Sequence, residues 1–241
     1  MSFKLWQNFS CGASMTGPMH IKNGTVNQDA FLIVKKQKYM LFVVSDGMGS
    51  KKFADVGSKN ACRAVQLEIE NFVKNRNAPF PVTQLFTNII DRWKQLLLPY
   101  EARDCSATCL FVFATKSKIL AARLGDGMIC LLGKDATDST VLADDKGDAF
   151  SNTTLSLSDP AAAAEFKYAL YDRAAFKGTV LSTDGISADM ENGKELAFAE
   201  AIHDELAKMH FWRRNAFIRN MMRDWPVPHH TDDKTLIVAG L

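Results

Sequence analysis

The chain has 241 residues, of which 47% are hydrophobic and 23% are charged. This composition is typical of a globular protein, and the length is enough to bury a core without disulfide bonds or a structural metal. A net charge of +2 gives no electrostatic case for nucleic-acid binding, and no apolar run approaches the roughly 20 residues of a membrane-spanning helix. Residues 1–6 lack the apolar centre of a secretion signal. We therefore expect one domain over residues 1–241, monomeric and cytoplasmic, with neither nucleic acid nor a membrane as its partner.

The five cysteines give no sign of a disulfide framework or a zinc site. They form no C-x-x-C pair, and an odd number cannot all pair within the chain. We predict reduced thiols, as in most cytoplasmic proteins. The five are Cys11, Cys62, Cys105, Cys109 and Cys130.

Hydrophobic periodicity predicts a regular succession of strands and helices. In chain order these are strands at 29–34 and 38–45, helices at about 54–74 and 82–97, strands at 106–115, 118–124 and 128–132, a polar loop excursion at 134–160, strands at about 165–172 and 178–183, helices at about 194–209 and 211–224, and a last strand at 235–239. This order does not alternate strand and helix, as a doubly wound parallel sheet would. It predicts an α+β fold, a four-layer αββα sandwich of two mostly antiparallel sheets flanked by helix pairs.

Two apolar runs end in the same way, in a hydroxyl residue followed by Asp-Gly. Residues 39–44 lead into Asp46 and Gly47, and residues 179–181 lead through Ser-Thr into Asp184 and Gly185. Such short runs without polar residues suit strands that are buried on both faces. Each run therefore places a carboxylate where a strand leaves the core. Several carboxylates at one end of a sheet form the oxygen-rich kind of site that binds Mg²⁺ or Mn²⁺.

Each of these aspartates also has a purely structural interpretation. Asp46 could cap the helix that follows, although a glycine-rich turn separates the two. Asp29 could be an ordinary strand-edge residue at the entrance of the first predicted strand. Residues 125–127, Gly-Asp-Gly, lie between two predicted strands and carry a strong hairpin-turn signal.

The pair Asp232 and Asp233 precedes the last predicted strand, where a solvated turn is the simple alternative. His229 and His230 lie beside them, so this stretch resembles a zinc-binding sequence. No cysteine or histidine stands at ligand spacing from them, which argues against zinc.

Taken in order, six short stretches resemble the metal-dependent protein phosphatase family (the protein phosphatase 2C type, or PPM), in its compact bacterial branch. Asp-Gly is common in any sequence, but all six stretches occur in the family's order and span nearly the whole chain. They are 27–31 (Asn-Gln-Asp-Ala-Phe), 44–49 (Val-Ser-Asp-Gly-Met-Gly), 106–108 (Ser-Ala-Thr), 124–127 (Leu-Gly-Asp-Gly), 181–185 (Leu-Ser-Thr-Asp-Gly) and 232–235 (Asp-Asp-Lys-Thr).

The resemblance implies a β-sandwich flanked by helices, with a site for two Mn²⁺ or Mg²⁺ ions at one end. By that resemblance Asp46 bridges the two ions and the Gly47 carbonyl binds one of them. Asp184 and Asp232 bind the other, which makes Asp46, Asp184 and Asp232 the expected catalytic residues. The implied reaction is hydrolysis of phosphoserine and phosphothreonine in phosphorylated proteins.

The same resemblance assigns supporting roles to two more carboxylates. Asp29 would hold the site directly or through a metal-bound water, and Asp126 would bind a weaker third ion together with Asp184. The family mechanism is in-line attack of a metal-bridging hydroxide on phosphorus without a covalent phosphoenzyme, so no cysteine is the expected nucleophile.

The chain departs from the family pattern at the substrate phosphate. Gly24 occupies the position where many members carry a phosphate-binding arginine. His20 and Lys22 are the nearest basic residues, and we expect one of them to bind the phosphate, although neither reproduces a bidentate arginine. The excursion at 134–160 lies where the family has its substrate flap.

The helical stretch at 211–224 is rich in arginine. Its charges are carried by Arg213, Arg214, Arg219 and Arg223. They form either a solvated helix face or a docking surface for an acidic partner.

Two other functions remain open at this level. The missing arginine would suit a catalytically weak phosphatase-like regulatory module that binds phosphoproteins or a partner. A simple calcium-binding domain would need a twelve-residue ligand loop, which the sequence lacks.

Overall fold

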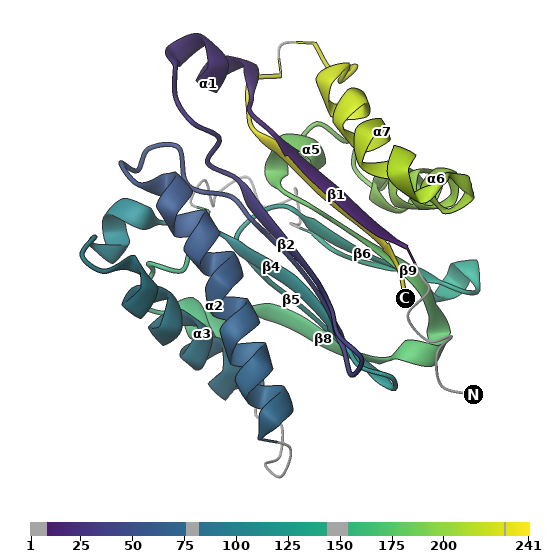
Figure 1. Cartoon of the computed structure of the whole chain (residues 1–241), viewed down its shortest axis with the longest axis horizontal. Coiled ribbons are helices and arrows are strands. Elements are labelled where there is room, and N and C mark those ends of the chain that lie inside the picture. The colour runs from purple at the N-terminus through teal and green to yellow at the C-terminus, as the bar shows by residue number, and fades with distance from the viewer. Residues whose placement is uncertain (1–8, 76–81, 144–153, 229) are drawn as a thin grey trace.

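The computed structural model describes residues 9–75, 82–143, 154–228 and 230–241. Its centre is a pair of five-stranded sheets (Figure 1). Sheet A has the order β1 (Ser10–Met15), β10 (Lys234–Gly240), β9 (Phe176–Ser182), β6 (Met128–Gly133) and β7 (Thr140–Leu142). Sheet B has the order β2 (Ala30–Lys35), β3 (Met40–Ser45), β4 (Cys109–Ala114), β5 (Lys118–Leu124) and β8 (Lys167–Asp172). Neighbouring strands are antiparallel in both sheets.

Two helix pairs complete the four layers. Helices α2 (Ala54–Lys74) and α3 (Val82–Leu97) cover the outer face of sheet B, and α6 (Glu195–Lys208) and α7 (Phe211–Arg223) cover sheet A (Figure 1). The predicted four-layer αββα arrangement is confirmed, and the long elements lie within a few residues of their predicted bounds.

Three apolar layers separate these four layers of secondary structure. Trp93 of α3 is fully buried against sheet B. Phe42 and Ile237 lie between the two sheets, and Leu206 of α6 packs against sheet A. The sequence of strand β3 is continuously apolar because both of its faces are buried. Alternate side chains point to opposite faces of the sheet, and each face of this strand contacts a core layer.

The shorter elements were not all predicted. Strand β1 and helix α1 (Pro18–Asn23) fall in a stretch for which we predicted no element, and β7 falls inside the predicted 134–160 excursion. Residues 144–153 of that excursion lie outside the described residues. The remaining short elements are helices α4 (Ala162–Glu165) and α5 (Asp184–Ser187) and the 3₁₀ turns η1 (Ala102–Cys105), η2 (Ala136–Asp138) and η3 (Arg173–Ala175).

The hairpin interpretation of residues 125–127 is wrong. Strand β5 before them belongs to sheet B, and β6 after them belongs to sheet A. The Gly-Asp-Gly segment therefore carries the chain from one sheet to the other rather than turning it back within a sheet.

All five cysteines are free and buried. Burial raises the pKa of the Cys11 thiol to about 12, and likewise that of Cys130. Both thiols are protonated at neutral pH and are therefore poor nucleophiles. Among the described helices, none combines the length and apolar character that crossing a membrane requires.

Candidate metal centre

Three carboxylates from distant parts of the sequence meet at one end of the sandwich. Asp46 follows β3, Asp126 lies between β5 and β6, and Asp184 follows β9. Each offers one carboxylate oxygen, and these oxygens lie within 4.8 Å of one another. The predicted convergence of strand-end aspartates therefore holds for Asp46 and Asp184, and the link between the sheets brings Asp126 to the same place.

Asp46 is held by the segment that leads into β4. Its backbone N–H donates to the Thr108 hydroxyl oxygen at 2.9 Å, and the Thr108 N–H donates to the Asp46 carbonyl at 2.8 Å. The Ser45 hydroxyl donates to the Thr108 carbonyl at 2.6 Å. Asp46 does not cap α2, because that helix begins at Ala54 with Phe53 as its N-cap residue. The capping interpretation is therefore wrong.

Gly47 lies where two other segments pass close to the chain. A Cβ at this position would lie 2.3 Å from the Ala54 carbonyl oxygen and 2.8 Å from that of Gln28. The Gly47 N–H donates to the Gln28 carbonyl at 3.2 Å. A residue with a side chain could not occupy this turn without displacing backbone.

Asp126 is presented by a backbone that only glycine adopts readily. Gly125 and Gly127 have φ values of 89° and 100°, in the region that favours residues without a Cβ. On the far side of the carboxylate, the Thr154 hydroxyl donates to Asp126 Oδ2 at 2.8 Å.

Asp29 is buried behind Asp46 and shares a side-chain hydrogen bond with it. The Thr183 hydroxyl donates to Asp29 Oδ2 at 2.8 Å and accepts from the Thr235 N–H at 3.1 Å. Sequence reasoning did not single out Thr183. Its only signal was its place in the Ser-Thr-Asp-Gly stretch, directly before Asp184.

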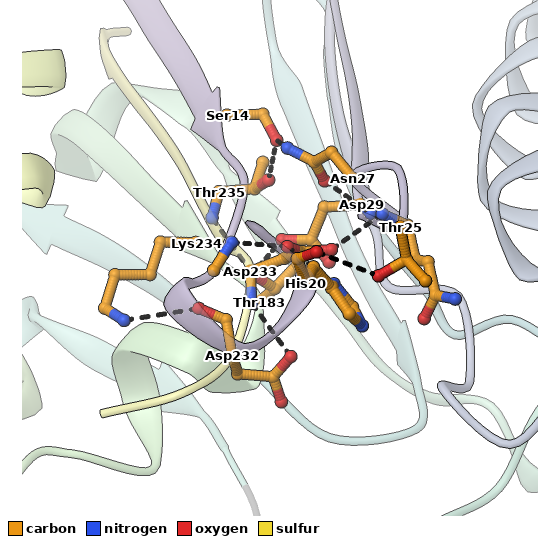
Figure 2. Close-up of polar contacts among 12 residues, drawn as sticks. Ser14, His20, Thr25, Asn27, Asp29, Thr183, Asp232, Asp233, Lys234 and Thr235 are labelled. Atoms are coloured by element: carbon orange, nitrogen blue, oxygen red, sulfur yellow. Dashed lines mark hydrogen bonds and ion pairs between the residues drawn. The ribbon is translucent and has the colours of Figure 1, made fainter. Parts of the chain in front are cut away.

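The adjacent aspartates at the start of β10 have opposite environments (Figure 2). Asp232 is exposed, and its negative charge helps to raise the pKa of both Asp46 and Asp184. Asp233 is 1% exposed. Its carboxylate accepts the N–H groups of Gly17 and Gln28, each at 2.6 Å. Asp232 thus lies beside the cluster without joining the three closest carboxylates, whereas Asp233 ties the N-terminal segment to β10.

His20 and Lys22 lie on the short helix α1. The His20 Nδ1 atom is 2.9 Å from Asp233 Oδ1, and its side chain is 17% exposed. Lys22 is exposed and makes no ion pair with any described residue. Gly24 has a φ of 66° and ends α1 in the left-handed conformation. That backbone is unfavourable for any residue with a Cβ, arginine included.

The electrostatics of the cluster favour a cation. Burial and then the charges of Asp46, Asp126 and Asp232 raise the pKa of Asp184 to about 8. Burial and then the neighbouring Asp29 raise the pKa of Asp46 well above its usual range. Carboxylates that repel one another in this way are relieved by bound positive charge.

The chemistry of the donor set fits Mg²⁺ or Mn²⁺ better than zinc. The side-chain donors brought together are all carboxylate oxygens, which suit hard divalent ions. His230 points its Nδ1 atom at Lys234 Nζ, 2.8 Å away, rather than into the cluster. His229 lies outside the described residues.

We expect the metal-free protein to become less stable as the pH rises from 5 to 8. The raised pKa of Asp184 means that the folded state retains a proton which the unfolded chain, with a carboxyl pKa near 3.9, has released. Stability from this group is complete below the unfolded pKa and is lost as the pH approaches about 8. Thermal melts in chelator should show a midpoint about 5–10 °C lower at pH 8 than at pH 5. Excess Mn²⁺ should flatten this dependence, and a pH-independent melt in chelator would contradict the proposed electrostatics.

The fold and the site together define an α+β sandwich with a cluster of carboxylates where its two sheets end. The chain belongs to the protein phosphatase 2C family, whose sequence model matches residues 16–225. Comparison with curated proteins gave no match.

Solved structures of bacterial phosphatases share the fold. The serine/threonine phosphatase Stp1 from Staphylococcus aureus is 17% identical with a TM-score of 0.66, and the match covers 98% of this chain and 95% of that one. A bacterial serine phosphatase is 16% identical with a TM-score of 0.70, over 97% and 98% of the two chains. The catalytic domain of the serine/threonine phosphatase PstP, solved with two manganese ions, is 15% identical with a TM-score of 0.59, over 97% of each chain. At these identities the likeness establishes the fold.

Proposed function

We propose that this chain is a metal-dependent serine/threonine protein phosphatase that hydrolyses phosphoserine and phosphothreonine in proteins without a covalent phosphoenzyme. The observation that carries the proposal is the meeting of Asp46, Asp126 and Asp184 within 4.8 Å, in a chain of the protein phosphatase 2C family.

The position of each carboxylate determines the role that we propose for it. Asp46, which interacts with Asp29 and lies in the three-carboxylate cluster, would hold both ions, with the Gly47 carbonyl as a further oxygen ligand. Asp184 and the exposed Asp232 would hold the second ion. Asp126, which is within reach of Asp184, would join it in holding a third.

Asp29 supports the site from behind. Because its carboxyl group already bonds to Asp46 and Thr183, we assign it the indirect role, which is to orient Asp46. Thr183 in turn fixes Asp29 and the start of β10 through its single hydroxyl group.

Bound Mg²⁺ or Mn²⁺ would neutralise these carboxylates and acidify a water molecule for in-line attack on phosphorus. The chain's own contribution is to hold the carboxylates in a fixed, partly buried arrangement that needs little rearrangement when the ions bind. Two divalent ions and four carboxylates sum to about zero charge, so a phosphate dianion needs a further positive group. We assign that role to His20, whose Nδ1 atom lies 2.9 Å from Asp233 Oδ1 and whose Nε2–H group would donate to a phosphate oxygen.

Replacing His20 with alanine should raise KM for a phosphothreonine peptide by about tenfold and change kcat less, because a ground-state phosphate contact is lost. The matched variant Lys22→Ala should have a smaller effect, since Lys22 is exposed and unanchored. Steady-state kinetics of both variants distinguish the two residues. An unchanged KM in His20→Ala would remove His20 from the phosphate site.

The proposed activity is tested with p-nitrophenyl phosphate and a phosphothreonine peptide, each assayed with Mn²⁺ and with a chelator. We expect turnover with Mn²⁺, its loss in chelator, and recovery when Mn²⁺ is restored. Tight Mn²⁺ binding without turnover would instead support the regulatory module.

A further inference from the structure

Helix α7 begins with two large aromatic side chains that the fold leaves in solvent. Phe211 is 71% exposed and Trp212 is 65% exposed. The ring of His210 lies against that of Trp212, with centroids 3.4 Å apart. Apolar surface gathered in this way on a folded domain commonly marks a contact with another molecule.

A groove lies beside these aromatic residues, where α6 ends and α7 begins. It has a volume of about 750 Å³. Met209, Trp212 and Phe217 give it apolar walls, and Lys208 and Arg213 stand on its rim. Among the described residues that line it, Glu205 alone is acidic. The groove therefore combines an apolar interior with a net positive border.

The exposed face of α7 extends that positive border along the helix. With 3.6 residues per turn, Trp212, Arg219 and Arg223 fall on one stripe, and Arg213 flanks it on the groove side. All four are exposed, and the sequence of α7 contains no acidic residue. From Trp212 to Arg223 the stripe is about 16 Å long at 1.5 Å per residue.

The arginines of α7 are not equivalent. Arg214 turns inward: its Nε donates to the Leu206 carbonyl at 2.8 Å and its guanidinium lies 4.6 Å from the Phe9 ring centroid. Arg223 faces Asp224 at 3.2 Å, in an exposed pair that contributes little. Arg213 and Arg219 make no ion pair with any described residue. Within the described residues, the contacts of the fold therefore engage Arg214 and, at the surface, Arg223, and they leave Arg213 and Arg219 without an ion pair.

We propose that this face of α7, the Trp212–Arg223 stripe with its groove, docks an acidic protein segment that inserts one apolar side chain into the groove. Charge complementarity selects the occupant: carboxylates pair with the arginines, and the apolar side chain fills the space beside Trp212. A lipid surface fits less well, because the apolar side chains gather at one end of the stripe and arginines occupy the rest. Helix α7 lies on the outside of the molecule along β1 (Figure 1), where a partner has access.

The test uses a synthetic peptide of about twelve residues, rich in glutamate, with one central leucine, which matches the length of the stripe. Binding is followed by nuclear magnetic resonance shifts of the isotope-labelled protein. The charge-reversal variant is Arg213→Glu with Arg219→Glu, and Trp212→Ala tests the groove. The matched control, Arg63→Glu with Lys94→Glu, reverses two exposed charges on α2 and α3, on the opposite side of the sandwich. Circular dichroism melts verify that all three variants fold.

We expect saturable binding with shifts concentrated on α7. The α7 charge reversal and Trp212→Ala should each weaken it at least about fivefold, whereas the control should change it less than about twofold. A peptide with the leucine replaced by serine should bind more weakly. No saturable shift at millimolar peptide, or equal losses in the control, would overturn the proposal. Binding of α7 to anionic phosphatidylglycerol vesicles but not to the peptide would overturn it in favour of a membrane surface. None of these readouts depends on phosphatase activity.

Discussion

Replacing Asp46 with asparagine is expected to lower Mn²⁺-dependent kcat by at least about a thousandfold, equivalent to about 4 kcal/mol of transition-state stabilisation. Asp46 is the residue that contacts Asp29 behind it and lies within 4.8 Å of Asp126 and Asp184 in front of it. In the proposed function Asp46 would hold both cations, and an amide lacks the negative charge needed for that role. The measurement is p-nitrophenyl phosphate turnover at saturating Mn²⁺.

The same variant should make the metal-free protein more stable. Burial and, after it, the charge of Asp46 raise the pKa of Asp184. Removing that charge relieves part of the repulsion, so the melting temperature in chelator should rise relative to the unmodified chain. Loss of activity together with a gain in stability separates a functional role from simple unfolding. Asp91→Asn, an exposed change on α3, is the control and should alter neither quantity. Retained activity in Asp46→Asn would place the reaction elsewhere.

The second large effect is expected from Gly185→Ala. A Cβ at Gly185 would lie 1.9 Å from the Asp233 carbonyl oxygen and 3.5 Å from the Asp232 Cβ. Since the nearest atom belongs to the backbone, either α5 or the start of β10 must shift. The shift would change the spacing between Asp184 and Asp232, and we expect a loss of about 2–3 kcal/mol in the free energy of unfolding and most of the Mn²⁺-dependent activity.

The control for this substitution is Gly49→Ala. It makes the same chemical change near the same site, but its Cβ would meet only the Gln28 side-chain oxygen at 3.5 Å, an ordinary contact. Denaturant unfolding and turnover of the two variants should therefore differ clearly. Equal stability and equal turnover in the two variants would mean that the 232–233 segment can shift without loss of stability, and that its position does not affect activity.

Long apolar elements were predictable because local pattern and burial agree in them. Strand β3 is buried on both faces, and its continuous apolar sequence follows from that. Strand β1 has a weak pattern, Ser-Cys-Gly-Ala-Ser-Met, and becomes a strand only because it pairs with β10 from the far end of the chain. No local signal could have revealed that partner.

The site was predictable to a similar degree. The position at a strand end indicated Asp46 and Asp184. The Gly-Asp-Gly sequence around Asp126 wrongly predicted a hairpin, because whether such a segment forms a hairpin depends on which sheet each flanking strand joins. The sequence also did not show that Asp232 is exposed and Asp233 is buried. Alternation of side chains at a strand entrance sends one carboxylate to solvent and the other inward, and only the fold determines which is which.

The pairing of β1 with β10 has a consequence for biosynthesis. The Cys11 thiol donates to the Val238 carbonyl, 227 residues further along the chain. Strand β1 therefore cannot pair during synthesis until β10 has been made, and sheet A is completed last. Sheet B, drawn from residues 30–172, can form earlier on the ribosome. We therefore expect a nascent intermediate in which one half of the sandwich is built and its inner apolar face awaits cover, the stage at which a chaperone would be most useful.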